Sequence, residues 1–128
     1  IKQVGWPKCG EIDILEYVGR APGEVFTSLH TQSSHGNTIN TKISKIAGID
    51  KGFHEYAIEW NEESIAFFVD GNHVYTYNPA VKNEDTWPYN QPFYFILNVA
   101  VGGNFGGPSI DEAAFPQTFE IDYIRVYQ

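Results

Sequence analysis

The sequence predicts an all-β sandwich that forms a single domain over residues 1–128. Stretches rich in β-branched and aromatic residues recur about every 8–12 residues, with turn-forming residues between them. No stretch has the length and the 3.6-residue apolar periodicity of a sizeable helix. Aromatic residues make up 16% of the chain, and such side chains commonly fill the cores of sandwiches. These three observations favour two packed sheets.

The first part of the chain alternates between expected strands and expected turns. Residues 10–17 and 24–30 predict strands, and residues 19–23, with Pro22 between two glycines, form a turn between them. Residues 31–37 are polar and end in glycine and asparagine, so we expect a loop. Residues 38–43 alternate polar and apolar side chains and predict a short third strand.

The middle of the chain predicts a strand followed by a hairpin. Residues 53–60 alternate strictly and are rich in aromatic and aliphatic side chains. Residues 64–69 and 73–77 flank Asp70-Gly71, a dipeptide that favours a tight turn between antiparallel strands.

The last part of the chain contains two further expected strands. Residues 93–101 are almost entirely apolar, so both faces of this strand should be covered. Residues 118–127 alternate and predict the last strand. The remaining segments are expected to be a loop at residues 78–91, a glycine-rich loop at 102–107 and one helical turn within 109–115.

Composition excludes several classes of partner. The net charge is −8, from 16 acidic residues against 8 lysines and arginines, which argues against nucleic acid and against an anionic membrane surface. No apolar run approaches the roughly 20 residues of a membrane-spanning helix. The single cysteine, Cys9, excludes an intrachain disulfide, and we expect it to be a small buried apolar residue.

Three acids lie close together in the first strand. Glu11 and Asp13 share one face of an extended chain, and Glu16 joins them only if a β-bulge absorbs one residue around Ile14 and Leu15. Ordinary solvated acids on a wet strand face are one interpretation. A functional site is the other, and the absence of lysine and arginine within the stretch favours it, because neighbouring acids without neutralisation tend to share protons.

Paired carboxyl groups suit one reaction in particular. Two carboxyls held about 5–5.5 Å apart perform retaining glycoside hydrolysis, in which one attacks as a carboxylate and the other holds a proton for the leaving oxygen. Along a flat strand the backbones of Glu11 and a bulge-shifted Glu16 would lie roughly 13 Å apart. The sheet must therefore be concave, with both side chains leaning inward, and Asp13 between them is placed to modulate the ionised one.

The run from Trp6 to Glu16 closely resembles the active-site strand of glycoside hydrolase family 16, in its laminarinase-like branch. Laminarinases, agarases and carrageenases of that family share the spacing Glu-x-Asp-x-x-Glu, whereas lichenases and xyloglucan-active members lack the extra residue. The resemblance continues in order along the chain, in residues 53–60, 69–71, 97–104 and 121–127.

The resemblance implies a concanavalin A-like jelly-roll sandwich with a substrate cleft across its concave sheet. It implies a retaining endo-hydrolase of β-1,3-glucan, with Glu11 as nucleophile, Asp13 as its assistant and Glu16 as acid/base. The alternatives are an agarase or a mixed-linkage glucanase of the same family, or a sandwich that binds carbohydrate without cleaving it. No cofactor is expected for catalysis.

Four residues are expected to contact substrate on the same resemblance. Trp6 would stack on a sugar, His30 would face the cleft near the acid/base, Asn98 would present a buried amide, and Phe105 would lie at the cleft rim. For Trp6 and His30 an ordinary structural role stays open. Asp122 corresponds to a ligand of a structural calcium ion in many family members, and plain solvation is the alternative.

Family domains have roughly another hundred residues before the Trp-Pro of this motif. The resemblance therefore implies that the chain corresponds to the C-terminal part of a catalytic domain, without its N-terminal strands. We expect another chain or a preceding segment to complete the sandwich, because unpaired apolar edges otherwise aggregate. The expected partner is a polysaccharide, and the expected location is secreted, periplasmic or at the cell surface.

Overall fold

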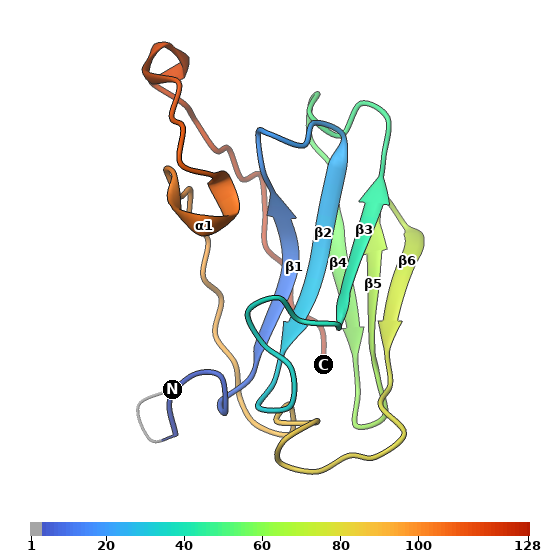
Figure 1. Cartoon of the computed structure of the whole chain (residues 1–128). Helices are drawn as coiled ribbons and strands as arrows, with labels where there is room; N and C mark the ends of the chain where they lie inside the picture. Colours follow the sequence, from blue (N-terminus) through green and yellow to red (C-terminus); the bar gives the residue numbers. More distant parts are fainter. Residues whose placement is uncertain (1–3) are drawn as a thin grey trace.

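Two three-stranded antiparallel sheets form among residues 4–128, the residues that the computed structural model describes (Figure 1). The predicted all-β sandwich is confirmed. The first sheet has the order β1-β2-β3, and the second has the order β4-β5-β6. The strands are β1 (Glu11–Tyr17), β2 (Glu24–His30), β3 (Thr41–Lys45), β4 (Tyr56–Trp60), β5 (Ile65–Val69) and β6 (Asn72–Tyr77).

The core lies between the two sheets, with β1 packed over β4 and β3 over β6. Alternate residues of β2 and β5 point into this layer, because successive side chains of a strand face opposite ways. The fully buried apolar side chains of these two strands are Val25, Leu29, Ile65, Phe67 and Val69. Aromatic residues of the loop after β6, Trp87 and Tyr89, close one end of the core.

The pairing of β1 with β2 contains the expected bulge. Glu11 lies opposite His30 and Asp13 opposite Ser28, but Glu16 lies opposite Phe26, so the register shifts between Asp13 and Glu16. Two residues of β1 are thus placed against one of β2, which returns Glu16 to the face that carries the other two acids. The prediction of a β-bulge is confirmed.

The β5-β6 hairpin turns at the predicted dipeptide. Asp70 and Gly71 adopt φ angles of 50° and 74°. Positive φ at both central positions gives the backbone twist that matches two antiparallel strands, and glycine reaches it without steric cost.

Asp70 also binds His54, which lies just before β4. His54 Nδ1 lies 2.7 Å from Asp70 Oδ2, and His54 Nε2 lies 3.2 Å from the Gly48 carbonyl oxygen. Asp70 Oδ1 accepts the Glu55 backbone N–H at 2.9 Å. The Asp70 contact raises the pKa of His54, and the His54 contact lowers the pKa of Asp70. The pair therefore joins the loop before β4 to the hairpin turn.

We expect this pair to make the stability of the fold depend on pH. The contribution of His54 is fully present below its ordinary pKa of 6.5 and is lost as pH rises through the raised value. The contribution of Asp70 is present above its ordinary pKa of 3.8 and is lost as pH falls through the lowered value. Both contributions are fully present between pH 3.8 and pH 6.5, so the melting temperature of His54→Gln should fall furthest below that of the unmodified chain in this pH range.

The control is His73→Gln, because the His73 ring contacts the Thr76 hydroxyl rather than a carboxylate. Equal melting temperatures for His54→Gln and the unmodified chain at pH 5 would show that the pair does not stabilise the fold.

Two expected strands do not form among the described residues. Residues 93–101 and 118–127 have no strand partner, and most of their apolar side chains are exposed. A strand needs a neighbour to bond its backbone N–H and C=O groups, and none of β1 to β6 pairs with these segments. Of these residues, Phe93 packs on the core, and its ring lies edge to face with that of Trp60, with 5.4 Å between the ring centroids. The expectation that both faces of 93–101 are covered is therefore wrong for this structure.

Three smaller boundaries also differ from the sequence prediction. The third strand begins at Thr41 rather than at residue 38, because the Thr38 hydroxyl donates to the Leu29 carbonyl and holds the preceding loop. The fourth begins at Tyr56 rather than at residue 53, since the Glu55 N–H bonds the Asp70 side chain. The glycine-rich loop contains one short helix, α1 (Gly103–Gly106).

Two local predictions are confirmed. The helical turn expected within residues 109–115 is a 3-10 turn over Glu112–Ala114, capped by the Asp111 side chain. Cys9 is a buried free thiol. No helix within the described part of the chain is both long and apolar enough to cross a membrane.

Candidate active site

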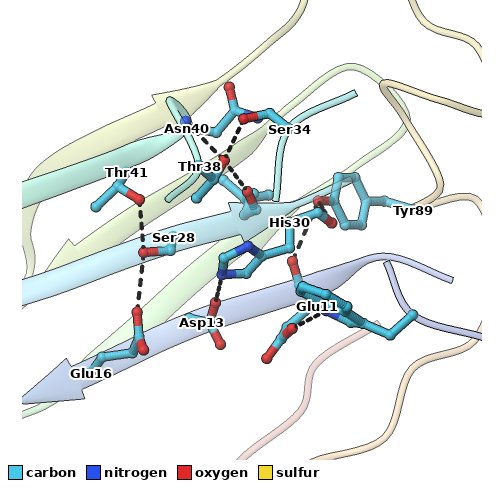
Figure 2. Close-up of polar contacts among 12 residues, drawn as sticks. Glu11, Asp13, Glu16, Ser28, His30, Ser34, Thr38, Asn40, Thr41 and Tyr89 are labelled. Carbon is cyan, nitrogen blue, oxygen red and sulfur yellow. Dashed lines mark hydrogen bonds and ion pairs between the residues drawn. The ribbon is translucent and has the colours of Figure 1, made fainter. Parts of the chain in front are cut away.

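The three acids of β1 lie on the face of the first sheet that points away from the core. Ile12 pairs with Leu29 on the inner face, so Glu11 and Asp13 face outward together with their β2 neighbours His30 and Ser28. Figure 2 shows Glu11, Asp13 and Glu16 along β1, with the side chains of Ser28 and His30 beside them. The bulge is the reason that all three acids share this face.

Glu11 and Asp13 form a compact cluster with His30. One side-chain nitrogen or oxygen atom of each residue lies within 4.8 Å of the others. His30 Nε2 lies 3.2 Å from Asp13 Oδ2, an ion pair when the ring is protonated. The indole Nε1 of Trp6 donates a hydrogen bond to Glu11 Oε2. An indole N–H donor and a histidine ring that can carry a positive charge thus face two carboxyls that would otherwise repel one another.

Glu16 has a separate hydrogen-bond donor. The Ser28 hydroxyl donates to Glu16 Oε2 at 3.1 Å, and the Thr41 hydroxyl donates to Ser28 Oγ at 3.1 Å. Figure 2 shows these three side chains as a continuous chain across β1, β2 and β3. The register explains it, because Ser28 pairs with Thr41 on one side and with Asp13 on the other.

Burial and mutual repulsion shift the ionisation of the acids. Desolvation, followed by the charge of Asp13, raises the pKa of Glu11, and the Trp6 hydrogen bond opposes that rise. The same two causes raise the pKa of Glu16, and the Ser28 hydrogen bond opposes them. The Asp13 contact raises the pKa of His30. Both glutamates therefore hold protons more readily than a free carboxyl. They differ in the group that donates to them, which is the Trp6 indole for Glu11 and the Ser28 hydroxyl for Glu16.

Trp6 lies over one end of this cluster. It is 48% exposed, and its ring centroid lies 5.9 Å from that of His30 and 5.3 Å from that of His35. An exposed indole beside carboxyl groups offers a flat apolar surface next to the reactive atoms. The alternative of a core tryptophan is wrong, because half of the side chain faces solvent. Its predicted stacking on a sugar stays a prediction.

We expect Trp6→Phe to raise the pKa of Glu11 further, because the variant keeps an aromatic ring but removes the N–H that stabilises the carboxylate. Titration of ¹³C-labelled glutamate side chains by NMR measures this shift. Trp60→Phe is the control, since Trp60 lies on β4 of the other sheet. An unchanged Glu11 titration in Trp6→Phe would contradict the assigned hydrogen bond.

Tyr89 supports the site from the core side. Its hydroxyl donates to the His30 carbonyl oxygen at 3.0 Å and lies 3.4 Å from the Glu11 carbonyl oxygen. The residue is buried, and burial raises the pKa of its phenol, so it stays a neutral donor. Tyr89 thus holds the start of β1 and the end of β2 at a fixed spacing.

The structure places His30 and Phe105 relative to the acids. His30, which was expected to face the cleft near the acid/base, lies across from Glu11 and contacts Asp13, and its charge also acts on Glu16. Phe105, in α1, packs edge to face on Phe26 at 5.1 Å, and Phe26 is the cross-strand neighbour of Glu16. Phe105 is therefore at the Glu16 end of the acidic face, and its contact with substrate stays a prediction.

The other two expected site residues lie outside the cluster. Asn98 is exposed within the unpaired segment 93–101, so the expectation of a buried amide is wrong for this structure, and its role with substrate stays a prediction. Asp122 is exposed on the last segment, and among the described residues it belongs to no group of three or more acids, histidines or cysteines that could hold a metal ion. The side chains present there do not build a calcium site, and calcium binding stays a prediction.

Sequence reasoning missed three residues that shape the site. Ser28 had a usable signal, because a strand ending at His30 places Phe26, Ser28 and His30 on one face. Thr41 and Tyr89 had none, since only the pairing of β3 and the path of the loop after β6 bring them to the acids.

The fold and the site together define a class of protein. A β-sandwich whose outer sheet face carries two glutamates on either side of an aspartate, with an exposed tryptophan beside them, has the groups that glycoside hydrolases use. The chain matches the family model "Glycosyl hydrolases family 16" over residues 2–125. The chain belongs to glycosyl hydrolases family 16.

Individual relatives agree with the family match. The β-glucanase of Rhodothermus marinus is 39% identical over 96% of this chain and 46% of its own length. The crystal structure of the laminarinase from Flavobacterium sp. UMI-01 is 66% identical and superposes with a TM-score of 0.89 over 91% of this chain and 50% of that one. A non-specific endo-β-1,3(4)-glucanase, SCLam, crystallised as a mutant with 1,3-β-D-cellotriosyl-glucose, is 38% identical, with a TM-score of 0.77 over 88% of this chain and 45% of that one.

The chain spans about half the length of these relatives. Its similarity to them covers nearly all of its own residues, including β1 and both sheets. Family membership is therefore established for the part of the fold that carries the acids. The activity of the whole protein is a separate question.

Proposed function

We propose that this chain carries the catalytic residues of a retaining endo-hydrolase that cleaves β-1,3-glucan of the laminarin type. The observation that carries the proposal is the placement of Glu11 and Glu16 on one outer face, each with its own hydrogen-bond donor and with Asp13 between them. The names of the similar β-glucanase and laminarinase support the choice of substrate. A net charge of −8 suits a neutral glucan better than a sulfated polysaccharide.

The proposed first step forms a covalent sugar–enzyme intermediate. Glu16 gives its proton to the glycosidic oxygen as the bond from that oxygen to the anomeric carbon breaks. Glu11 attacks the same carbon as a carboxylate, and the Trp6 N–H and the His30 ring help to keep it ionised until then. The raised pKa of Glu16 suits a group that must enter the reaction protonated.

The proposed second step releases the sugar. Glu16, now a carboxylate, takes a proton from water while the water oxygen attacks the anomeric carbon. The bond to Glu11 breaks, Glu11 leaves as a carboxylate, and Glu16 is protonated again. Two inversions at the same carbon retain the anomeric configuration.

Hydrolysis of a panel of polysaccharides tests the proposal. Together with the strands that complete its sandwich, the chain should release reducing ends from laminarin faster than from lichenan or agarose, and NMR of the first products should show the β-anomer. Short oligosaccharides of mixed length at early times indicate endo cleavage. Tight laminarin binding without products over long incubation would instead support a non-catalytic binding module, and faster cleavage of agarose would move the substrate to that polymer.

The proposal also includes further strands that cover the exposed apolar segments, and a location of the protein outside the cytoplasm. The exposed apolar side chains within residues 94–101 and 119–127 support the prediction that strands of another segment or chain cover them. A polysaccharide does not cross a membrane unaided, so the protein would meet it outside the cytoplasm, by secretion, in a periplasm or at the cell surface.

A further inference from the structure

A chain of hydroxyl groups ends at one oxygen of Glu16. Thr41 Oγ1 donates to Ser28 Oγ at 3.1 Å, and Ser28 Oγ donates to Glu16 Oε2 at 3.1 Å. Ser28 is only 3% exposed, whereas Thr41 lies at the start of β3 and is partly exposed. The link crosses three adjacent strands, so the sheet register itself holds it in place (Figure 2).

The carboxylate form of Glu16 sets the direction of the two hydrogen bonds, because a carboxylate oxygen only accepts. A serine hydroxyl carries one hydrogen and accepts through its lone pairs. Because Thr41 donates to Ser28, the single proton of Ser28 is free to point at Glu16 Oε2. Oε2 is then an acceptor. While this direction is kept, a proton gained by Glu16 lies on the other oxygen, Oε1, to which Ser28 does not donate.

We propose that Ser28 and Thr41 are positioning residues that direct the acidic proton of Glu16 to Oε1, the oxygen that serves the glycosidic bond. This inference rests on the proposed role of Glu16 as acid/base. Neither hydroxyl touches the reacting atoms. Ser28 fixes the rotation of the carboxyl group, and Thr41 fixes the orientation of the Ser28 hydroxyl.

Other charged groups act on Glu16 at the same time. Asp13 and Glu11 on β1 raise its pKa, as does burial, and His30 on β2 lowers it. Ser28 acts in the same direction as His30, because its hydrogen bond favours the carboxylate. Removal of the Ser28 hydroxyl should therefore raise the pKa of Glu16 while leaving these three groups in place.

Three variants test the inference in the full chain. In Ser28→Ala, we expect kcat on laminarin to fall about tenfold with little change in KM, since the lost contact acts on proton delivery rather than on binding. The alkaline limb of the pH profile, which reports loss of the Glu16 proton, should move to higher pH. Thr41→Val should lower kcat and move the alkaline limb in the same direction as Ser28→Ala, but to a smaller extent. Thr41→Ser, which keeps the hydroxyl, should behave as the unmodified chain.

An NMR titration of ¹³C-labelled glutamates, assigned with Glu16→Gln, measures the Glu16 pKa without any need for turnover. A raised pKa in Ser28→Ala supports the hydroxyl chain, and an unchanged pKa and pH profile would overturn it. Equal behaviour of Thr41→Val and Thr41→Ser would overturn the role of Thr41, and that pair is informative even if Ser28→Ala folds poorly, because Thr41 is partly exposed. Absence of laminarin cleavage by the unmodified chain joined to the strands that complete its sandwich, with the expected titrations, would reject the proposed function alone.

Discussion

Replacing Glu11 by serine is expected to abolish the release of reducing ends from laminarin. The shorter side chain carries no carboxylate to form the covalent intermediate, and loss of a nucleophile typically lowers kcat by about 10⁴-fold or more. The backbone should be undisturbed, because Glu11 faces outward from the sheet and contributes nothing to the buried core. Reducing-sugar assays on the purified variant, with circular dichroism to confirm folding, measure the effect.

A second acid variant separates the roles of the two glutamates. Glu16→Ala should lose activity on laminarin, but it should still form the intermediate from an aryl glycoside whose leaving group needs no proton. Glu11→Ser should fail on both substrates. Glu63→Gln is the control for loss of an acid elsewhere, since Glu63 lies on the surface and pairs with Lys82. Full laminarin activity in Glu11→Ser would remove Glu11 from the proposed mechanism.

Gly10→Ala is expected to destabilise the fold by about 2–5 kcal/mol. Gly10 has a φ of +74°, which costs another residue about 1–2 kcal/mol. A Cβ atom there would lie 2.8 Å from Pro88 Cγ and 3.0 Å from Tyr89 Cε1. Such overpacking adds about 1–3 kcal/mol, a large part of a typical stability of about 5–15 kcal/mol. Tyr89 would also be pushed from the carbonyl oxygens of Glu11 and His30.

Gly36→Ala separates the two contributions. Gly36 has a similar φ of +66°, but a Cβ atom there would meet nothing within 4 Å. Urea denaturation should therefore show only the backbone term for Gly36→Ala and a clearly larger loss for Gly10→Ala. Equal losses of unfolding free energy in the two variants would mean that the loop with Pro88 and Tyr89 moves aside at little cost. Gly10 would then not be needed for close packing.

The sequence predicted best where a local rule governs the structure. The hairpin at Asp70-Gly71 follows from the φ angles that those two residues tolerate. The strand at residues 24–30 lies between a predicted turn and a predicted polar loop, and its bounds agree with β2 (Glu24–His30). Prediction failed at residues 93–101 and 118–127, because apolar composition indicates a strand but says nothing of whether a partner strand lies beside it.

In the candidate site, too, local features could be predicted and contacts between distant residues could not. The spacing of Glu11, Asp13 and Glu16 was enough to predict a bulge, since the period of a strand is two residues and the acids are two and three residues apart. The contacts made by Ser28, Thr41 and Tyr89 could not be predicted, because they depend on the register of three strands and on the path of a loop.

The sequence by itself determined the sandwich class, the bulged acidic strand and the family resemblance. These depend on alternation, turn chemistry and residue identity, all of which act over a few neighbouring positions. Only the tertiary structure decided which donor serves each glutamate, with Trp6 for Glu11 and Ser28 for Glu16. A hydrogen bond acts over about 3 Å, and only the folded sheet brings residues distant in sequence within that range.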